Sequence, residues 1–439
     1  MPLLMIYAMT TFAVVIFAWL IASSQHTNLY SLRNLFMAVW LYYGFSVGLD
    51  LMTGAEIPYT PGETHMMDPT SWNAVAFVMW NYVLCGVAFI ATYFVLQGST
   101  ESRPLPLRFD LQTPPAWALI LIHLLSAYVY VQVFFGMDRM ERIAMSQLHV
   151  SYKFTTLLVP LTLAMDVMVV LSSKTKTDHK AIIAIALAFL LSLLTGNRSY
   201  LMFVFLIGAF HWRPPLQGWR LLGMVASCAG MVFAFKTLYA VGLAWYMGVR
   251  VDGRMIYDNL HLTLSGLDAD ASYSIALFYT SHTSPLWLGK TYVVTPFMLA
   301  WPRFLGGMHV STLAEDYVWM YHISTAKRGG AMAFSAIAES WLNFSYAGPV
   351  IIGVGWGAIT NFFDRRPRGL PYLIVLLMVA RVFRSDAASL FKNWIMVWGL
   401  MFLLALVLMT IYSALVAPVR PSFVRQQPTP TPRLGGNLP

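Results

Sequence analysis

Charged residues are scarce in this chain, and long polar stretches are almost missing from it. Of its 439 residues only 11% are charged, whereas 58% are apolar, and the mean hydropathy is +0.63. No charged residue occurs between Lys392 and Arg420. Apolar runs of this length indicate helices that cross a hydrocarbon core about 30 Å thick. The composition therefore predicts an all-α polytopic membrane protein.

Cysteine and metal-binding patterns are also nearly absent. The two cysteines, Cys85 and Cys228, both lie in apolar runs, which argues against a disulfide framework and against a metal site. The sequence contains no H-x-x-x-H or C-x-x-C spacing, so we expect no metal and no other cofactor. A cleavable signal peptide is not expected either, because the N-terminus lacks an early basic region and its apolar run is long enough to span.

Acidic residues are outnumbered, and the net charge is +9. A basic chain can bind nucleic acid, but here the basic residues lie mainly in short loops between apolar runs. The positive-inside rule explains that distribution, so no nucleic-acid partner is expected.

The apolar runs define the candidate membrane spans. They cover about 3–22, 34–52, 73–96, 114–135, 153–171, 219–241, 335–362, 370–383 and 391–417. Residues 1–417 are expected to form a single integral membrane domain that includes one large polar loop, 246–334. Residues 418–439 are rich in Pro, Gln and Thr, which predicts a disordered tail.

One further apolar region, 181–211, decides the predicted topology because Thr195-Gly-Asn-Arg-Ser199 interrupts it. A single crossing would bury Arg198 at its middle, whereas a broken helical hairpin would enter and leave on one side. The hairpin gathers fourteen basic residues on one membrane side: Arg33, Arg103, Arg108, Lys174, Lys176, Lys180, Arg213, Arg220, Arg365, Arg366, Arg368, Arg420, Arg425 and Arg433. By the positive-inside rule this side is cytoplasmic, so the 246–334 loop and the N-terminus lie outside and the tail inside.

Several arginines are candidates for binding an anion. Arg198 lies between two apolar half-helices, where a charge is costly and usually functional, although it could instead snorkel or cap helix carbonyls. Arg250 and Arg254, and likewise Arg381 and Arg384, share a face if helical. Paired guanidinium groups suit a phosphate or pyrophosphate. Lipid headgroups are the alternative partner of Arg250 and Arg254, and Asp386 is an alternative partner of Arg381 or Arg384.

Candidate proton acceptors lie on the same predicted side. Glu339 begins an apolar run, where it could act as a base or only stabilise the start of its helix. His309 and His322 are single histidines of the polar loop, and such residues are more often simply exposed. Glu315 and Asp316 form an acidic pair that could bind a cation.

Three stretches together resemble the Wzy-type family of O-antigen and oligosaccharide repeat-unit polymerases. Thr195-Gly-Asn-Arg-Ser199 is similar to that family's small-residue Arg-Ser element. Glu339-Ser-Trp-Leu-Asn-Phe-Ser-Tyr-Ala-Gly348 resembles its "E…NFG..G" stretch, with Ser345 where the family commonly has Gly. Arg381-Val-Phe-Arg-Ser-Asp386 resembles its late Arg-rich turn. In layout the resemblance covers roughly residues 150 to 415.

The resemblance implies about 9–11 transmembrane helices in a GT-C-like arrangement, located in the bacterial inner membrane. It implies a glycosyltransferase that joins undecaprenyl-pyrophosphate-linked repeat units into O-antigen or exopolysaccharide at the periplasmic face. The catalytic residues would come from Glu339, His309 and His322, and the five arginines named above would bind pyrophosphate. The expected partners are the lipid-linked oligosaccharide and the bilayer, with a chain-length regulator protein left open.

Other functions remain open at this point. An O-antigen ligase shares the general plan. A metal-using membrane glycosyltransferase would need an acidic pair in an early outer loop, but Glu56, Glu63 and Asp68 are not adjacent. A transporter or lipid flippase would predict internal repeats, and none is evident.

The predicted topology can be tested with reporter fusions. A reporter at Gly266, in the polar loop, should signal a periplasmic position, and one at Gln427, in the tail, a cytoplasmic position. Paired alkaline phosphatase and green fluorescent protein fusions measure both. The same signal at the two positions would refute the topology.

Overall fold

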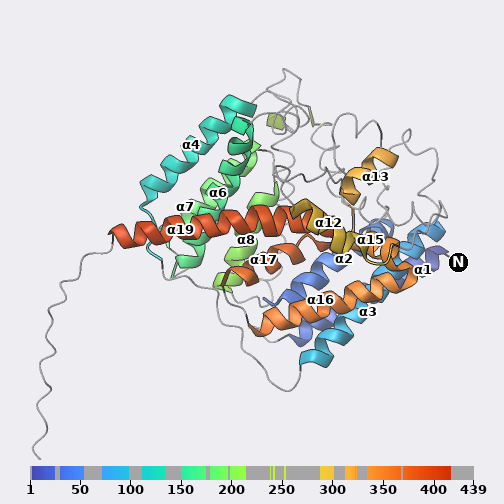
Figure 1. Ribbon diagram of the computed structural model, residues 1–439. Helices are drawn as coiled ribbons and strands as arrows, with labels where there is room; N and C mark the ends of the chain where they lie inside the picture. The colour runs from blue at the N-terminus through green and yellow to red at the C-terminus, as the bar shows by residue number, and fades with distance from the viewer. Residues whose placement is uncertain are drawn as a thin grey trace, which may run out of the picture.

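The computed structural model describes residues 2–24, 30–53, 72–97, 111–134, 150–174, 178–195, 198–213, 287–300, 312–321, 334–366 and 369–416, together with the isolated positions 238, 241–242, 252–253 and 323. Across these ranges every regular element is helical and no strand occurs. The all-α prediction is therefore confirmed for this part of the chain (Figure 1).

The helices follow one another in the order α1 (Pro2–Ser23), α2 (Leu32–Thr53), α3 (Trp72–Gln97), α4 (Ala116–Phe134), α6 (Val150–Ser172), α7 (His179–Thr195), α8 (Arg198–Trp212), α12 (Lys290–Ala300), α13 (Leu313–Tyr321), α15 (Ala336–Phe344), η3 (Ser345–Ala347), α16 (Gly348–Arg365), α17 (Gly369–Val379), η4 (Val382–Arg384), α18 (Ala387–Leu390), η5 (Phe391–Trp398) and α19 (Gly399–Val416). Of the described helical segments, 5 are long and apolar enough to cross a membrane. Shorter apolar helices cover 157–172, 179–195, 202–212 and 369–379. The chain is therefore a polytopic membrane protein, as its composition predicts.

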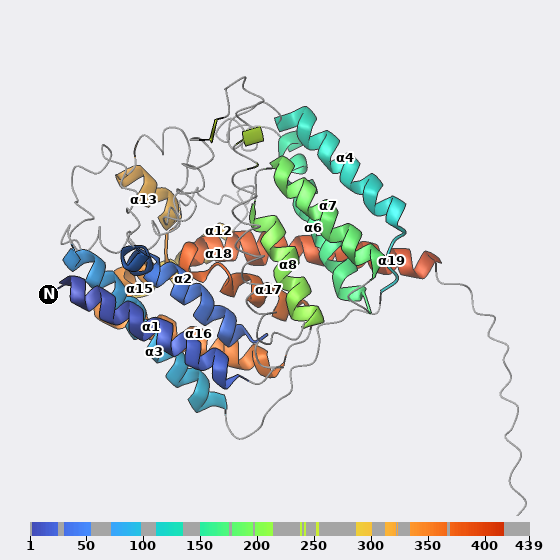
Figure 2. The ribbon, with the colours of Figure 1, turned by 180° about the vertical axis from the view of Figure 1, so that it is seen from behind.

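The helices form two groups joined by the C-terminal helix. Helices α1, α2, α3 and α16 pack together, and α4, α6, α7 and α8 form the second group (Figures 1 and 2). Helix α19 packs along α6, and through η5 it reaches α17 and α12. The short helices α12, α15 and α18 lie where these parts meet, which brings distant stretches of sequence to one place.

The predicted break in the 181–211 region is present. Helix α7 ends at Thr195 and α8 begins at Arg198, and these helices of 17 and 15 residues pack against each other and against α6. Each is about 23–26 Å long at 1.5 Å per residue, which is shorter than the hydrocarbon core. The single long crossing is therefore wrong.

Other predicted boundaries change. The 335–362 run is not one continuous helix, because the 3₁₀ turn η3 separates α15 from α16. Its neighbour, 370–383, is helical only as far as Val379 and then turns. The last run begins earlier, at Ala387, and passes through the π-helical segment η5. Nearly all of 219–241, most of the 246–334 loop and the 418–439 tail lie outside the described residues.

Two glycines let α16 lie directly on α3. A Cβ atom added at Gly353 would overlap the carbonyl oxygen of Cys85, and one added at Gly357 would lie 2.8 Å from the carbonyl oxygen of Phe89. Their four-residue spacing is a small-xxx-small pattern, which permits close backbone approach of helices in lipid. This contact fixes α16, and therefore η3 and α15 before it.

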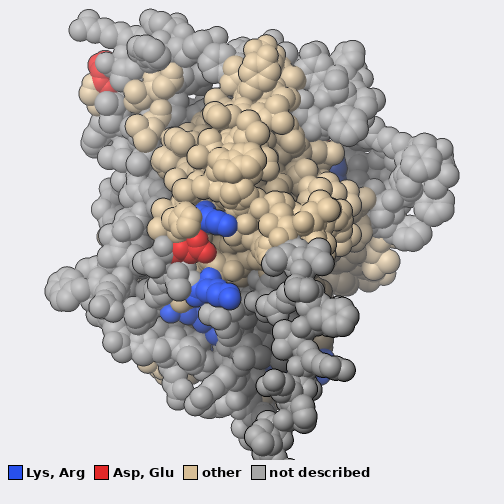
Figure 3. Space-filling view, turned by 90° about the vertical axis from the view of Figure 1, so that its left-hand side faces the viewer, with Lys and Arg blue, Asp and Glu red and all other residues tan. Residues whose placement is uncertain are grey.

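Apolar side chains cover much of the outer surface. Leu121, Leu124 and Leu125 of α4 are all more than half exposed. On the face shown in Figure 3, the described surface is almost entirely uncharged, and the few charged side chains are confined to small areas. Such a surface suits contact with lipid tails.

A buried polar pair joins α4 to α6. His123 Nδ1 lies 2.9 Å from the Leu119 carbonyl oxygen, and its Nε2 lies 2.9 Å from Asp166 Oδ2. One turn further along α4, the Ser126 and Thr162 hydroxyl groups are 2.6 Å apart. Polar side chains that bond across helices hold membrane helices in register.

The α3–α16 contact predicts a contrast between two glycines of one helix. Gly353→Ala should lower the free energy of unfolding by about 1–3 kcal/mol because its methyl group meets the α3 backbone. Gly355→Ala is the matched control, since nothing lies within 4 Å of a Cβ at Gly355. Thermal unfolding midpoints in detergent should fall only for the first variant. Equal midpoints would mean that α16 does not pack so closely.

Candidate active site

The start of α15 is capped by Ser335 and not by Glu339. The Ser335 hydroxyl accepts a hydrogen bond from the Ala338 N–H at 3.1 Å, and its carbonyl oxygen accepts one from Glu339 N–H at 3.0 Å. Glu339 follows inside the first turn, and its side chain is 0% exposed. Ser335 is therefore the N-cap of α15, and Glu339 lies in the first turn, where the helix dipole favours an acidic residue.

The Glu339 carboxylate instead contacts the start of another helix. Its Oε2 accepts a hydrogen bond from the Ala387 N–H at 2.6 Å, and Ala387 is the first residue of α18. A carboxylate at a helix start is favoured by the helix dipole. The other oxygen, Oε1, is buried and has no hydrogen-bond partner in the described part of the chain.

Asp386, directly before Ala387, places a second carboxylate at the same point. Its Oδ1 accepts a hydrogen bond from Ser389 N–H at 3.3 Å, which caps α18, and its Oδ2 accepts one from Leu313 N–H at 3.0 Å. Leu313 begins α13, so Asp386 connects the polar loop to the membrane helices. Asp386 makes no ion pair with an arginine among the described residues, so the proposed pairing with Arg381 or Arg384 is wrong.

Asn343 attaches α12 to this pair of carboxylates. It lies one turn after Glu339 on α15, and its Nδ2 donates to the Glu339 carbonyl oxygen at 2.8 Å and to the Thr291 hydroxyl at 2.6 Å. The backbone N–H of Trp287 donates to the Leu342 carbonyl oxygen at 3.2 Å. The Glu-x-x-x-Asn spacing therefore holds Thr291, at the start of α12, beside Glu339.

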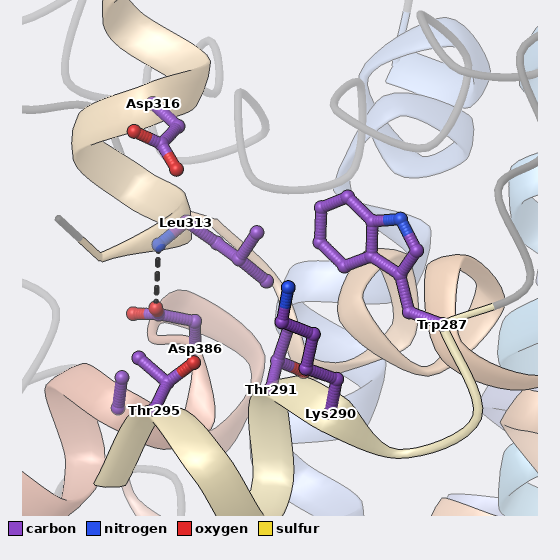
Figure 4. Close-up of a pocket in the computed structure, with 8 residues that line it drawn as sticks. Trp287, Lys290, Thr291, Thr295, Leu313, Asp316 and Asp386 are labelled. Carbon is purple, nitrogen blue, oxygen red and sulfur yellow. Dashed lines mark hydrogen bonds between the residues drawn. The ribbon is translucent and has the colours of Figure 1, made fainter. Parts of the chain in front are cut away.

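A cavity of about 210 Å³ opens next to the carboxylates. Its lining residues come from α12 and the turn before it, from α13, and from the start of α18: Trp287, Lys290, Thr291, Thr295, Leu313, Asp316, Asp386 and Ala388. Figure 4 shows Trp287 and Lys290 on one side of this space and Asp316 and Asp386 on the other. Asp386 is thus a lining residue although it is 0% exposed, whereas Glu339 is not a lining residue.

Glu315 and Asp316, the two acidic residues of α13, have different roles. Glu315 Oε2 accepts a hydrogen bond from Thr312 N–H at 2.9 Å, and the Thr312 hydroxyl accepts one from Glu315 N–H at 3.3 Å. This reciprocal pair is a capping box, which stabilises the start of α13. Asp316 is the residue that lines the cavity. Among the described residues no group of three metal-ligating side chains occurs, so the pair acting as a cation site gains no support.

The end of α15 explains the glycine positions of the motif. Ser345 has φ 52° and ψ −136°, a backbone conformation that favours glycine. It is also the position where this chain departs from the resembling family. A Cβ atom at Gly348 would overlap the Ser340 carbonyl oxygen, so only glycine lets α16 start this close to α15.

Arg381 and Arg384 lie at the two ends of η4, and the Arg384 N–H donates to the Arg381 carbonyl oxygen at 2.9 Å. Residues three apart eclipse in a 3₁₀ turn, which keeps the two on one side as the sequence predicts. The Arg381 guanidinium lies over the Phe203 ring of α8, 5.6 Å from its centre. Arg198 begins α8, about 7.5 Å further along its axis at 1.5 Å per residue.

The remaining predicted site residues lie outside the described part. Arg250, Arg254, His309 and His322 are among them, and the side chain of Arg198 is not described although its backbone is. The structure therefore brings Glu339 beside Asp386. It also packs the Arg381 side chain against α8, the helix that begins at Arg198.

Sequence reasoning missed the side chains that line the cavity. Trp287, Lys290 and Thr291 fall in the polar loop without a recognisable motif, and Asp386 was considered only as an ion-pair partner. A signal was available for α13, because Thr312-Leu-Ala-Glu315 has the capping-box spacing. The Asp386-Ala-Ala-Ser389 stretch likewise has a preferred N-cap residue before small helix formers.

These geometries define a class of site. A carboxylate that borders a cavity can accept a proton from a bound substrate. Burial raises the pKa of Asp386, and hydrogen bonds from Ser389 and Leu313 oppose that shift. A raised pKa makes the carboxylate a stronger base than an exposed one.

One family model matches the C-terminal part of the chain. Residues 279–414 match the family model described as O-antigen polysaccharide polymerase Wzy. The match covers every cavity residue, the Glu339–Gly348 motif and the arginine turn, so the resemblance is confirmed for this segment. It supports a membrane protein of polysaccharide biosynthesis with a glycosyltransferase-like polymerase activity. Neither a curated protein nor a solved structure matches the chain.

The backbone at Ser345 predicts a stabilising substitution. Ser345→Gly should raise the free energy of unfolding by about 1 kcal/mol, because a non-glycine residue at positive φ costs about 1–3 kcal/mol and the entropy loss offsets part of that. Ser345→Ala is the control, since it keeps Cβ and should give no gain. Denaturation in mixed detergent micelles measures both. Equal stabilisation by Ala and Gly would rule out backbone strain.

Proposed function

We propose that this protein polymerises oligosaccharide repeat units carried on undecaprenyl pyrophosphate, at the periplasmic face of the bacterial inner membrane. The observation that carries the proposal is the cavity that Asp386 lines, with Glu339 hydrogen-bonded to the adjacent Ala387, in the segment that matches the polymerase family. Two lipid carriers must reach such a site laterally, which suits a position where short helices meet between groups of apolar helices.

The reaction needs a proton acceptor. A hydroxyl group of the acceptor sugar attacks the anomeric carbon of the donor glycan. The bond from that carbon to the pyrophosphate oxygen breaks, and the lipid pyrophosphate leaves with the electron pair. The hydroxyl proton passes to the Asp386–Glu339 carboxylate pair, with Asp386 in contact with the cavity. Direct displacement of this kind inverts the anomeric centre.

The leaving group needs positive charge. A pyrophosphate gains negative charge as the bond breaks, and guanidinium groups can stabilise it without a metal. Among the described residues, the candidates are Arg381 and Arg384 on η4, together with Arg198, whose backbone begins α8. Arg250 and Arg254 are further candidates from the polar loop. The N-terminus of α8 adds the favourable end of a helix dipole.

Purified protein with a lipid-linked repeat unit tests this function. The wild-type protein should give a ladder of products, whereas a single addition onto a lipid-A core would identify a ligase. Asp386→Asn and Glu339→Gln should each lower the polymerisation rate on the order of 10²- to 10⁴-fold. Glu339→Gln keeps an oxygen that can accept the hydrogen bond from Ala387 N–H. Asp386→Asn keeps one oxygen for the N–H groups of Leu313 and Ser389, so its thermal unfolding midpoint is compared with that of the wild-type protein.

The pH dependence gives a second readout of the same experiment. The base works only when deprotonated, so the rate should fall as pH drops through the raised pKa of Asp386, above the ordinary range of an aspartate. Residual activity of Asp386→Asn should lack this acid limb. His309→Ala and His322→Ala are controls that should keep the ladder. A full ladder from Glu339→Gln, with loss in a histidine variant, would transfer the base role to that histidine.

A further inference from the structure

We infer that the 210 Å³ cavity is the subsite that binds the terminal sugar of the acceptor repeat unit, with Trp287 as the surface against which the sugar ring stacks. This inference rests on the proposed function and adds to it the identity of the group that occupies the cavity. The reasons are the size of the cavity, the chemistry of its lining and its charge.

The cavity has the size of one small polar ligand. A protein cavity of about 150 Å³ can hold a benzene molecule, so a cavity of about 210 Å³ suits a single sugar ring. Its lining is divided between an aromatic face and hydroxyl, carboxylate and ammonium groups. Sugar rings need this combination, because one face of the ring carries C–H bonds and the edge carries hydroxyl groups.

Trp287 is available for stacking. Its side chain is 37% exposed although its backbone is fixed by the hydrogen bond to Leu342 and by the following turn. Gly289 in that turn has φ 84°, a conformation that favours glycine and lets α12 begin at Lys290. The indole ring is therefore held at the cavity by a defined turn and remains open to a ligand (Figure 4).

Polar groups line the cavity beside and opposite the indole. Asp316 and Asp386 can each accept hydrogen bonds from sugar hydroxyl groups, while Thr295 and Lys290 can donate to ring or hydroxyl oxygens. Asp386 is held by the N–H groups of Leu313 and Ser389, so its position does not depend on the ligand. A hydroxyl group that meets Asp386 is placed to lose its proton.

The charge of the cavity favours the acceptor sugar over the donor pyrophosphate. The described lining residues carry two carboxylates and one ammonium group, so the formal charge of this part of the lining is negative. A pyrophosphate would be repelled there, and the described arginines Arg381 and Arg384 are not lining residues. The acceptor's terminal sugar is far from its own lipid phosphate and carries the attacking hydroxyl, so it fits both conditions.

Direct binding to the purified full-length protein tests this assignment. The probe is the lipid-free oligosaccharide released by mild acid from the host's lipid-linked repeat unit, and saturation-transfer NMR measures its binding. Wild-type protein should bind it, and inorganic pyrophosphate should not displace it. Trp287→Ala should weaken binding about tenfold through loss of stacking, and Asp316→Asn should also weaken it. Trp287→Phe keeps an aromatic face and should retain most of the affinity.

Variants of neighbouring residues supply the controls. Trp319 of α13 is 57% exposed and does not line the cavity, so Trp319→Ala should bind as wild type does. Equal binding by wild type and Trp287→Ala, or no binding by wild type at millimolar oligosaccharide, overturns the acceptor subsite even if the polymerisation ladder forms. Binding that is lost in Trp287→Ala, combined with no ladder from wild type, overturns the polymerase proposal and leaves the sugar subsite intact.

Discussion

The hydrogen bond from Ala387 N–H to the Glu339 carboxylate joins the two halves of the site. It buries a carboxylate at the start of α18, where Asp386 already caps the helix and also holds the first turn of α13. A buried carboxylate without partners would be very costly, so these backbone donors are what make the arrangement possible. Asn343 and Thr291 then attach α12 to the same centre. Loss of this bond would remove the hydrogen-bonded link between α15 and α18.

Most of the fold could be predicted from hydropathy, because a helix in lipid must satisfy its own backbone and so reveals itself as an apolar run. The broken 181–211 region was predictable as well, since the charge of Arg198 made a single crossing costly. The division between α15 and α16 could not be predicted, because Ser345 and Gly348 look like ordinary residues of an apolar run. Only the close approach of Gly348 to Ser340 and the positive φ of Ser345 reveal the break.

The site was predictable where one stretch carried its chemistry. Glu339 and Asn343 lie on one face of α15, and the motif around them could be read directly. The cavity could not be predicted, because Trp287, Asp316 and Asp386 come from three separate stretches, which are joined in part by hydrogen bonds from the backbone N–H groups of Trp287 and Leu313. The sequence shows the chemistry of each side chain. Every residue except proline carries the same backbone N–H group, so the sequence does not reveal which of these groups join distant segments.

The pair formed by His123 and Asp166 has a consequence for how helices α4 and α6 enter the bilayer. Since the Leu119 carbonyl oxygen can only accept, His123 Nδ1 must carry a hydrogen, and a second proton must lie between Nε2 and the Asp166 carboxylate. Whichever atom holds that proton, the pair has no net charge. Helices α4 and α6 can therefore cross into hydrocarbon as a neutral couple, although each alone would bring an ionisable group. The two helices are therefore expected to enter the bilayer together and not one after the other.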